Sequence, residues 1–85
     1  GNPVAAEILL KGILDRSPGA AIARMELATL YLDQKRFDDA KEQVLEAMKD
    51  APPAVRRENL QNFAQALRQL GATAQADAVL QAAGV

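Results

Sequence analysis

The stretch LATLYLDQKRFDDAKEQVLEAMKDAPP, from Leu27 to Pro53, decides how this chain folds. It is rich in charged residues, yet small and large apolar residues return at the spacing of amphipathic helices. Those positions are Leu27, Ala28, Tyr31, Phe37, Ala40, Val44 and Ala47. The stretch therefore predicts two helices joined by a short turn at Asp33–Phe37, each with an apolar and a solvated face.

Similar breaks divide the rest of the chain, at Ser17–Gly19, Ala51–Ala54 and Leu70–Thr73. Good helix formers fill the segments between them, and no alternation of period two lasts long enough for a strand. We expect five helices, at about Val4–Asp15, Gly19–Asp33, Phe37–Asp50, Ala54–Leu70 and Thr73–Ala83. Because the connections are short, consecutive helices should lie antiparallel.

Two helix ends and one apolar stripe can be predicted in detail. Ser17 can cap the second helix with Pro18 at its first position, and Gly71 suits a left-handed end of the fourth. The apolar stripe of the first helix is expected at Val4, Ile8, Leu9, Gly12 and Ile13. Alanines recur on the faces that must touch, where they let helix backbones approach closely. They are Ala28, Ala40, Ala47, Ala64, Ala76 and Ala83.

The central pattern resembles the tetratricopeptide repeat, a helix–turn–helix unit of about 34 residues. The matching positions are Leu27, Ala28, Tyr31, Phe37, Ala40, Val44, Ala47 and Pro52. The chain departs from the family at Arg24, where Trp is common, and at Lys35, where the turn often has Gly. A degenerate second copy follows at Leu60, Phe63, Ala64, Leu67, Gly71, Ala76, Leu80 and Ala83.

The resemblance covers nearly the whole chain: one repeat at about 21–54, a degenerate one at about 55–85, and a preceding half repeat marked by Ala6, Leu10 and Pro18. It implies a single all-α domain over residues 1–85, a right-handed α-α superhelix, or solenoid, of five antiparallel helices. A generic helical bundle is the alternative.

In this family the first helix of each pair lines a concave groove that holds a peptide or helix of a partner protein. The resemblance places twelve residues there: Ile22, Met25, Glu26, Thr29, Leu32, Asp33, Glu58, Gln61, Asn62, Gln65, Arg68 and Gln69. Amides such as Asn62 and Gln65 can pair with an extended backbone, and Met25 offers an adaptable apolar contact. The alternative is that these are solvated positions, or are covered by a further repeat.

Some family members clamp the C-terminal carboxylate of heat-shock chaperones with Lys, Asn and Arg. Here Asn62 fits one clamp position, but Met25 and Thr29 stand where Lys and Asn are required, which argues against that partner. The acidic run at Asp33, Asp38 and Asp39 lacks the glycine and spacing of a calcium loop. Arg56 and Arg57 begin a helix beside Glu58, which favours a solvated helix start over an anion site.

Composition argues against chemistry at a site. The 85 residues contain neither Cys nor His, so thiolate metal ligands and an imidazole base are excluded. Ser17 is the single serine, and no glycine-rich phosphate loop occurs, so we expect no enzyme, metal or cofactor. A net charge of −1 gives little reason to expect nucleic acid as a partner, and no segment is long enough to insert into a membrane.

Two functions remain open. The first is a protein–protein interaction module that binds a peptide or helix in the groove. The second is a structural spacer or self-association segment of a longer repeat protein, favoured by apolar residues of the first helix such as Leu9 and Leu10, which are expected to be exposed. Recruitment of substrate for a neighbouring catalytic domain is a weaker third. The start at Gly1-Asn2, without Met, indicates a fragment; the composition is typical of bacteria and leaves cytoplasm or periplasm open.

Overall fold

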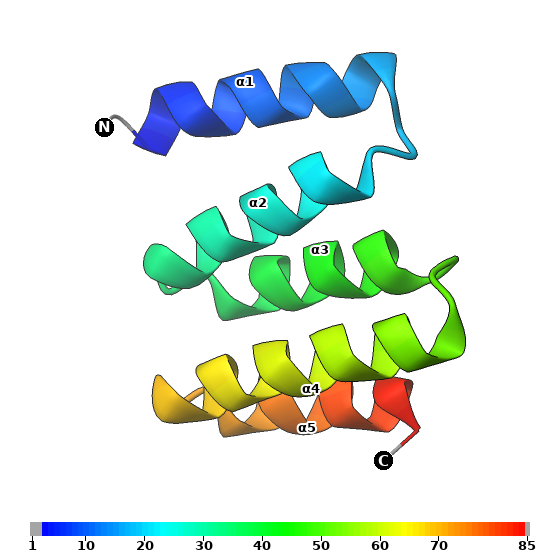
Figure 1. The fold of residues 1–85 in the computed structure, drawn as a ribbon. Coiled ribbons are helices and arrows are strands. Elements are labelled where there is room, and N and C mark those ends of the chain that lie inside the picture. Colours follow the sequence, from blue (N-terminus) through cyan, green and yellow to red (C-terminus); the bar gives the residue numbers. More distant parts are fainter. Residues whose placement is uncertain (1–2, 85) are drawn as a thin grey trace.

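Five helices follow one another down a stack in the order of the chain (Figure 1). The computed structural model describes residues 3–84, and no strand occurs in that range. The helices are α1 (Pro3–Arg16), α2 (Ala21–Asp33), α3 (Phe37–Met48), α4 (Pro53–Gln69) and α5 (Thr73–Ala83). The all-α helical repeat fold is confirmed, whereas the right-handed sense of the stack stays a prediction. Gly1, Asn2 and Val85 lie outside the described residues.

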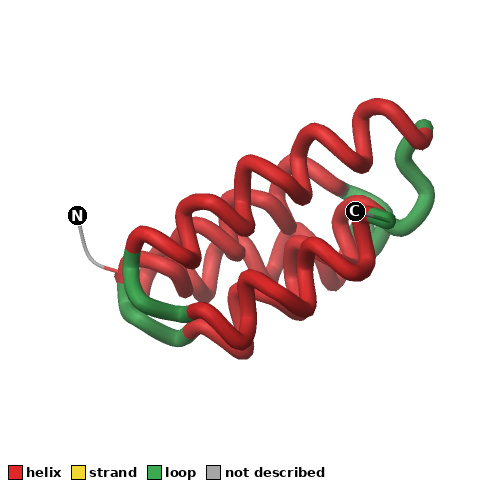
Figure 2. Tube along the Cα trace, turned by 90° about the horizontal axis from the view of Figure 1, so that it is seen from below, coloured by secondary structure: helices red, strands yellow, loops and turns green. Residues whose placement is uncertain are grey.

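Consecutive helices run antiparallel, because the loops that join them lie alternately at opposite ends of the helices (Figure 1). Figure 2 shows these loops gathered at the two ends of the helices. Helix α2 packs mainly on α3 and α4 mainly on α5, while α1 packs chiefly on α2. Helix α3 also contacts both helices of the second pair. The stack measures 34 × 28 × 15 Å, so its thinnest dimension has room for little more than one pair of helices.

The recurring alanines lie on the packed faces of the helices, as the sequence predicts. Ala28, Ala40 and Ala76 have no exposed surface, Ala64 and Ala83 are buried, and Ala47 is half-buried. Larger side chains interlock around them, and the largest that are fully buried are Leu27, Val44, Leu60, Leu67 and Val79. Because the packing around these alanines has no room for a longer side chain, their small size lets the helices approach closely.

The turns inside the two helix pairs have the same geometry. Arg36 N–H donates to the carbonyl of Tyr31 at 2.8 Å, and Ala72 N–H donates to the carbonyl of Leu67 at 2.9 Å. The residue before each donor has a left-handed backbone, with φ of 61° at Lys35 and 85° at Gly71. The left-handed conformation of Gly71 confirms the prediction for the end of α4. Lys35 has the same left-handed conformation, which glycine adopts without strain, and this explains why the family often has Gly at that position.

The predicted apolar stripe of α1 is wrong at three of its five positions, whereas Ile13 is half-buried and packs against the core as expected. Val4, Ile8 and Leu9 are each more than 60% exposed, and the buried residues are Leu10 and Leu14. Apolar residues occur on every side of this helix, so their spacing alone cannot tell which side meets α2. The expectation that Leu10 is exposed is therefore also wrong, whereas Leu9 is exposed as expected.

Ser17 does not cap α2. Its backbone N–H continues α1 by donating to the carbonyl of Ile13 at 2.8 Å, and its own carbonyl accepts from Ala20 N–H at 3.0 Å. Pro18 and Gly19 lie in the resulting turn, and α2 begins only at Ala21, with Ala20 at its N-cap and no side-chain hydrogen bond there. Ser17 thus belongs to the end of α1, because the turn between the two helices takes up residues 17–20.

Candidate functional site

The buried faces of α2 and α4 determine which side chains these helices present to solvent. In α2 the core takes Ala23, Leu27, Ala28 and Tyr31, and in α4 it takes Leu60, Phe63, Ala64 and Leu67. The twelve predicted groove residues lie off these stripes. Ten of them are exposed and two, Met25 and Leu32, are half-buried. The predicted surface is therefore open to solvent along both helices.

A mainly apolar depression of about 480 Å³ lies between α2 and α4. Four of the predicted residues line it, all from α2: Ile22, Met25, Glu26 and Thr29. Ala21, Met48 at the end of α3, and Asn59 of α4 complete its wall. We call this depression the α2–α4 pocket.

A second depression, of about 500 Å³, lies on the other side of α4. Four predicted residues of α4 line it, namely Gln61, Gln65, Arg68 and Gln69, together with Ala64 and with Leu80 of α5. Amides dominate this wall, as the sequence predicts. Arg68 is not free there, because its Nη2 pairs with Asp77 Oδ1 of α5 at 3.0 Å.

The structure does not bring all twelve predicted residues into one cavity. Leu32, Asp33, Glu58 and Asn62 line neither depression, although Glu58 directly precedes Asn59 of the α2–α4 pocket. Helix α4 separates an apolar part of the surface from an amide-rich part. The amphipathic character predicted from the sequence is thus present, divided between the two flanks of one helix.

Three residues of the α2–α4 pocket are not among the predicted twelve: Ala21, Met48 and Asn59. Asn59 stands next to buried Leu60, at the border of the apolar stripe of α4, and its Nδ2 donates to the carbonyl of Val55 at 2.9 Å. A position at the border between the buried and the exposed face is one that a groove residue can occupy, so the sequence pattern could have indicated Asn59. Met48 is buried at the end of α3, and it also lines the pocket.

Two polar groups near the surface are already engaged inside the chain. Thr29 Oγ1 donates to the carbonyl of Met25 one turn earlier, at 3.1 Å. Arg24, where the family often has Trp, donates to Gln43 Oε1 at 3.0 Å and to the carbonyl of Pro18 at 3.1 Å. Arg24 therefore links α2 to α3 and to the preceding turn, which gives this departure from the family pattern a structural role.

The charged clusters noted in the sequence also join elements of the fold. Arg56 is half-buried and donates to the carbonyl of Ala82 near the end of α5, so the expected solvated helix start is wrong for this residue. Asp38 and Asp39 lie in the first turn of α3, as predicted. Asp38 accepts from Gln75 Nε2 of α5 at 3.0 Å. Within residues 3–84 no three acidic side chains gather as metal ligands would.

These features define an α-helical repeat protein that presents an open, amphipathic surface. The family model described as Tetratricopeptide repeat matches residues 1–61, from α1 into α4. The chain belongs to the tetratricopeptide repeat family. Among curated proteins and among solved structures nothing matches it significantly.

Membership of this family indicates a role in protein–protein interaction or as a scaffold, and members are generally not enzymes. Among the helices of the described range, none combines the length and the apolar character that crossing a lipid bilayer requires.

Proposed function

We propose that this chain is a protein-interaction module that holds a peptide or a helix of a partner against the exposed faces of α2 and α4. The observation that carries the proposal is that α2 and α4 each have one buried face and one exposed face. One face of each is packed in the core, and the other offers ten exposed and two half-buried residues at the positions that the family uses for binding.

The chemistry of this surface suits a polypeptide ligand. Gln61, Gln65 and Gln69 offer both donors and acceptors to a backbone, and the α2–α4 pocket offers apolar contact at Ile22 and Met25. Peptide recognition of this kind combines backbone hydrogen bonds with pockets for single side chains. Asn62 is exposed, but the Lys and Asn needed for a carboxylate clamp are missing at Met25 and Thr29, so a chaperone C-terminus is not the ligand we propose.

Affinity capture with the full chain, followed by titration of the identified partner, tests this proposal. Met25→Ala and Gln65→Ala should each weaken binding by about fivefold or more, the usual effect of truncating an interface residue that matters. Gln81→Ala, on the exposed side of α5, is the control and should bind as the wild type does. A partner that binds both groove variants with unchanged affinity would contradict groove binding.

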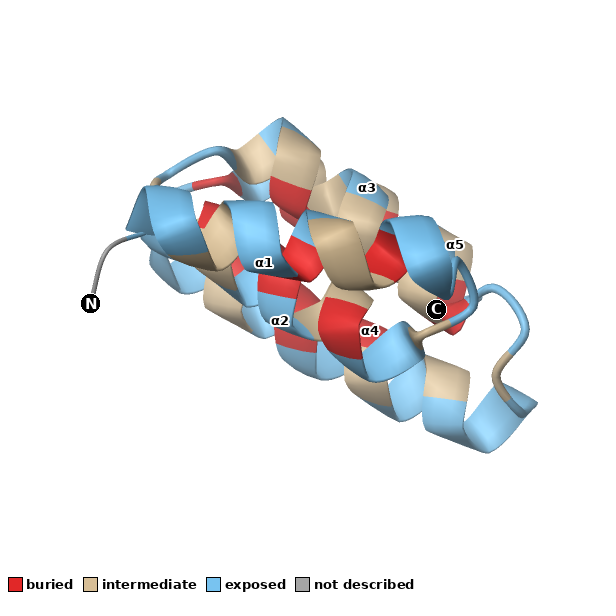
Figure 3. Cartoon of the chain, turned by 90° about the horizontal axis from the view of Figure 1, so that it is seen from above, coloured by how far each residue is buried: buried red, intermediate tan, exposed pale blue. Residues whose placement is uncertain are grey.

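A second candidate function is self-association through the outer face of α1, which Figure 3 shows to be largely exposed. When α1 is aligned with α3 as the equivalent helix of the repeat, Ala6 matches Ala40 and Leu10 matches Val44. In this alignment Ile8 corresponds to Glu42 and Leu9 corresponds to Gln43. The polar surface of α3 is thus replaced by apolar surface on α1, and Ile8 and Leu9 are 67% and 63% exposed. Exposed apolar patches of this kind mark contacts between chains.

Solution mass measured over a dilution series separates this function from groove binding. Self-association predicts a mass that falls on dilution, and Ile8→Glu should abolish the larger species. Leu70→Gln removes a leucine outside α1 that is 50% exposed, and it should leave the larger species unchanged. A mass of one chain at every concentration would contradict self-association and leave groove binding untouched.

A further inference from the structure

The α2–α4 pocket carries an apolar anchor point that the fold itself does not use. Ile22 is 79% exposed, the most exposed of the large apolar residues, yet it lies in the wall of the pocket beside Met25 and Met48. Two methionines give the wall a polarisable and adaptable shape. Such a wall suits one aliphatic or aromatic side chain of a ligand, whose burial would cover Ile22.

The charges around this anchor point are negative and unpaired. Glu26 lines the pocket, Asp33 follows it two turns later in the same row of α2, and Glu58 is exposed on α4 in the row of Gln61 and Gln65. Within residues 3–84 none of these three carboxylates takes part in an ion pair. By contrast, the carboxylates that serve the fold, such as those of Glu46 and Asp77, are paired.

The nearby cations do not offset this charge. Arg68, the one cation among the twelve predicted residues, is paired with Asp77, and Lys49 is paired with Glu46. Arg24 donates to Gln43 and Pro18. Arg57 is exposed, but it shares a helical row with Gln61 and Arg68, on the flank of α4 that borders the second depression.

A neighbouring depression of about 560 Å³ is a poorer candidate. It shares Ala21 and Met48 with the α2–α4 pocket, but it is lined by Arg24, Glu46, Lys49 and Asp50. Three of these four side chains already bond to other groups of the protein. Its charges are mixed and mostly satisfied, so it selects no particular ligand.

From the apolar anchor and the unpaired carboxylates, we infer that the α2–α4 pocket selects a basic peptide segment, with one large apolar side chain flanked by Lys or Arg. The apolar side chain enters between Ile22, Met25 and Met48, and the flanking cations meet Glu26 and Asp33 along the same row of α2. This inference rests on the proposed function, since it names the chemistry of the ligand for the same surface. An acidic segment would find no free cation beside the anchor.

Selection from a displayed pool of short random peptides, with the full chain as bait, tests the inference. The enriched peptides should combine an aliphatic or aromatic residue with flanking Lys or Arg. One enriched peptide is then synthesised in two forms, with Lys and with Glu at the flanking positions, and both are titrated by fluorescence anisotropy. The basic form should bind more tightly, by about two- to fivefold for each carboxylate engaged, and the difference should shrink as salt is added.

Variants of the pocket assign the charge preference to specific residues. Glu26→Lys combined with Asp33→Lys should reverse the preference between the two forms. The matched control is Glu42→Lys, on an exposed position of α3 outside the groove, which should leave the preference unchanged. Ile22→Ser should weaken both forms by about tenfold or more, because it removes the apolar contact.

The outcomes separate this inference from the proposed function. Enriched peptides that are acidic or show no charge bias, but lose affinity with Ile22→Ser, would overturn the inference and leave groove binding supported. An unchanged preference in the Glu26→Lys and Asp33→Lys double variant would also overturn it. Failure to enrich any peptide, or equal binding to wild type, Ile22→Ser and Gln65→Ala, would count against both.

Discussion

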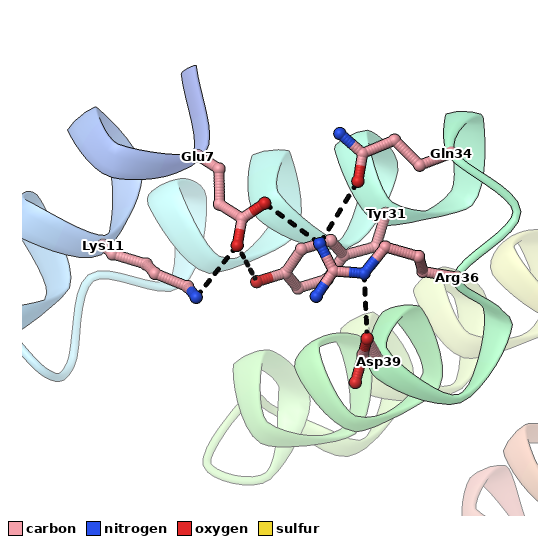
Figure 4. Close-up of polar contacts among 6 residues, drawn as sticks. All are labelled: Glu7, Lys11, Tyr31, Gln34, Arg36 and Asp39. Carbon is pink, nitrogen blue, oxygen red and sulfur yellow. Dashed lines mark hydrogen bonds and ion pairs between the residues drawn. The ribbon is translucent and has the colours of Figure 1, made fainter. Parts of the chain in front are cut away.

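The carboxylate of Glu7 in α1 accepts the hydroxyl hydrogen bond of Tyr31 in α2, with 3.2 Å between Oε2 and Oη (Figure 4). Its other oxygen pairs with Arg36 Nη1 at 3.0 Å, and the Arg36 guanidinium lies over the Tyr31 ring, 4.1 Å from its centroid. One carboxylate thus ties α1 to α2 and to the turn before α3. The Tyr31 position of the repeat pattern serves the attachment of the preceding helix as well as the core.

The charge of Glu7 should make the stability of the protein depend on pH. A hydrogen bond from Lys11 is the main cause that lowers the pKa of Glu7 below its ordinary value, helped by Tyr31 and by the positive charge of Arg36. A carboxyl whose folded pKa is lowered stabilises the fold fully above its unfolded pKa, and this contribution is lost as the pH falls through the folded value. The loss should therefore occur below about pH 4.3, the usual pKa of glutamate.

Urea denaturation at neutral and at acidic pH measures this contribution. Glu7→Gln should be less stable than the wild type at pH 7, and the two should converge below the usual glutamate pKa, where Glu7 is protonated. Glu42→Gln, at an exposed position, should track the wild type at both values. An equal gap between Glu7→Gln and the wild type at both pH values would contradict the assignment.

Tyr31→Phe tests the same contact from the other side. The ring stays in the core, but Glu7 loses one donor, so the variant should be less stable than the wild type. Because the two groups interact directly, the Tyr31→Phe and Glu7→Gln double variant should lose less stability than the sum of the single changes. Strict additivity in this cycle would show that the hydrogen bond contributes nothing.

Lys35→Gly should stabilise the protein, by up to about 1 kcal/mol. Lysine at a φ of 61° carries strain that glycine does not, partly offset by the greater freedom of glycine in the unfolded chain. Gly71→Ala should do the reverse and cost about 1 kcal/mol, since a Cβ there meets no other atom and only the backbone strain counts. Thermal and urea denaturation measure both.

Gly12→Ala is the control for these turn variants. A Cβ at Gly12 also meets no atom, but this glycine lies inside α1, so the change should raise helix stability by about 0.5–1 kcal/mol. Equal effects of glycine-to-alanine changes at positions 12 and 71 would contradict the role of the left-handed conformation.

The helix pairs could be predicted from the sequence because their apolar residues recur at helical spacing and are separated by charged residues. In α3, charged Glu42 and Glu46 alternate with buried Ala40 and Val44, so the inner face is unambiguous. Helix α1 lacks that contrast. Apolar side chains surround it, and only its single main neighbour, α2, determines that Leu10 rather than Ile8 is buried.

The candidate site could be predicted only as a set of exposed positions. The resemblance to the repeat family places Ile22 and Gln65 on the groove faces of their helices, and both are exposed. It cannot show that α4 divides the surface, because that depends on how far α4 stands from α2 and from α5. Met48 reaches the α2–α4 pocket from the end of a third helix, and no spacing within one helix reports such a contact.

The alanine contacts give the most direct test of how the helices pack. Ala76 and Ala74 both belong to α5, but Ala76 has no exposed surface whereas Ala74 faces solvent. Ala76→Leu should cost about 1–3 kcal/mol, because the larger side chain must push the neighbouring helices apart. Ala74→Leu should change stability little, since leucine is nearly as good a helix former as alanine. Urea denaturation of both variants decides: an equally small effect at the two positions would mean that alanine at position 76 does not set the distance between the helices.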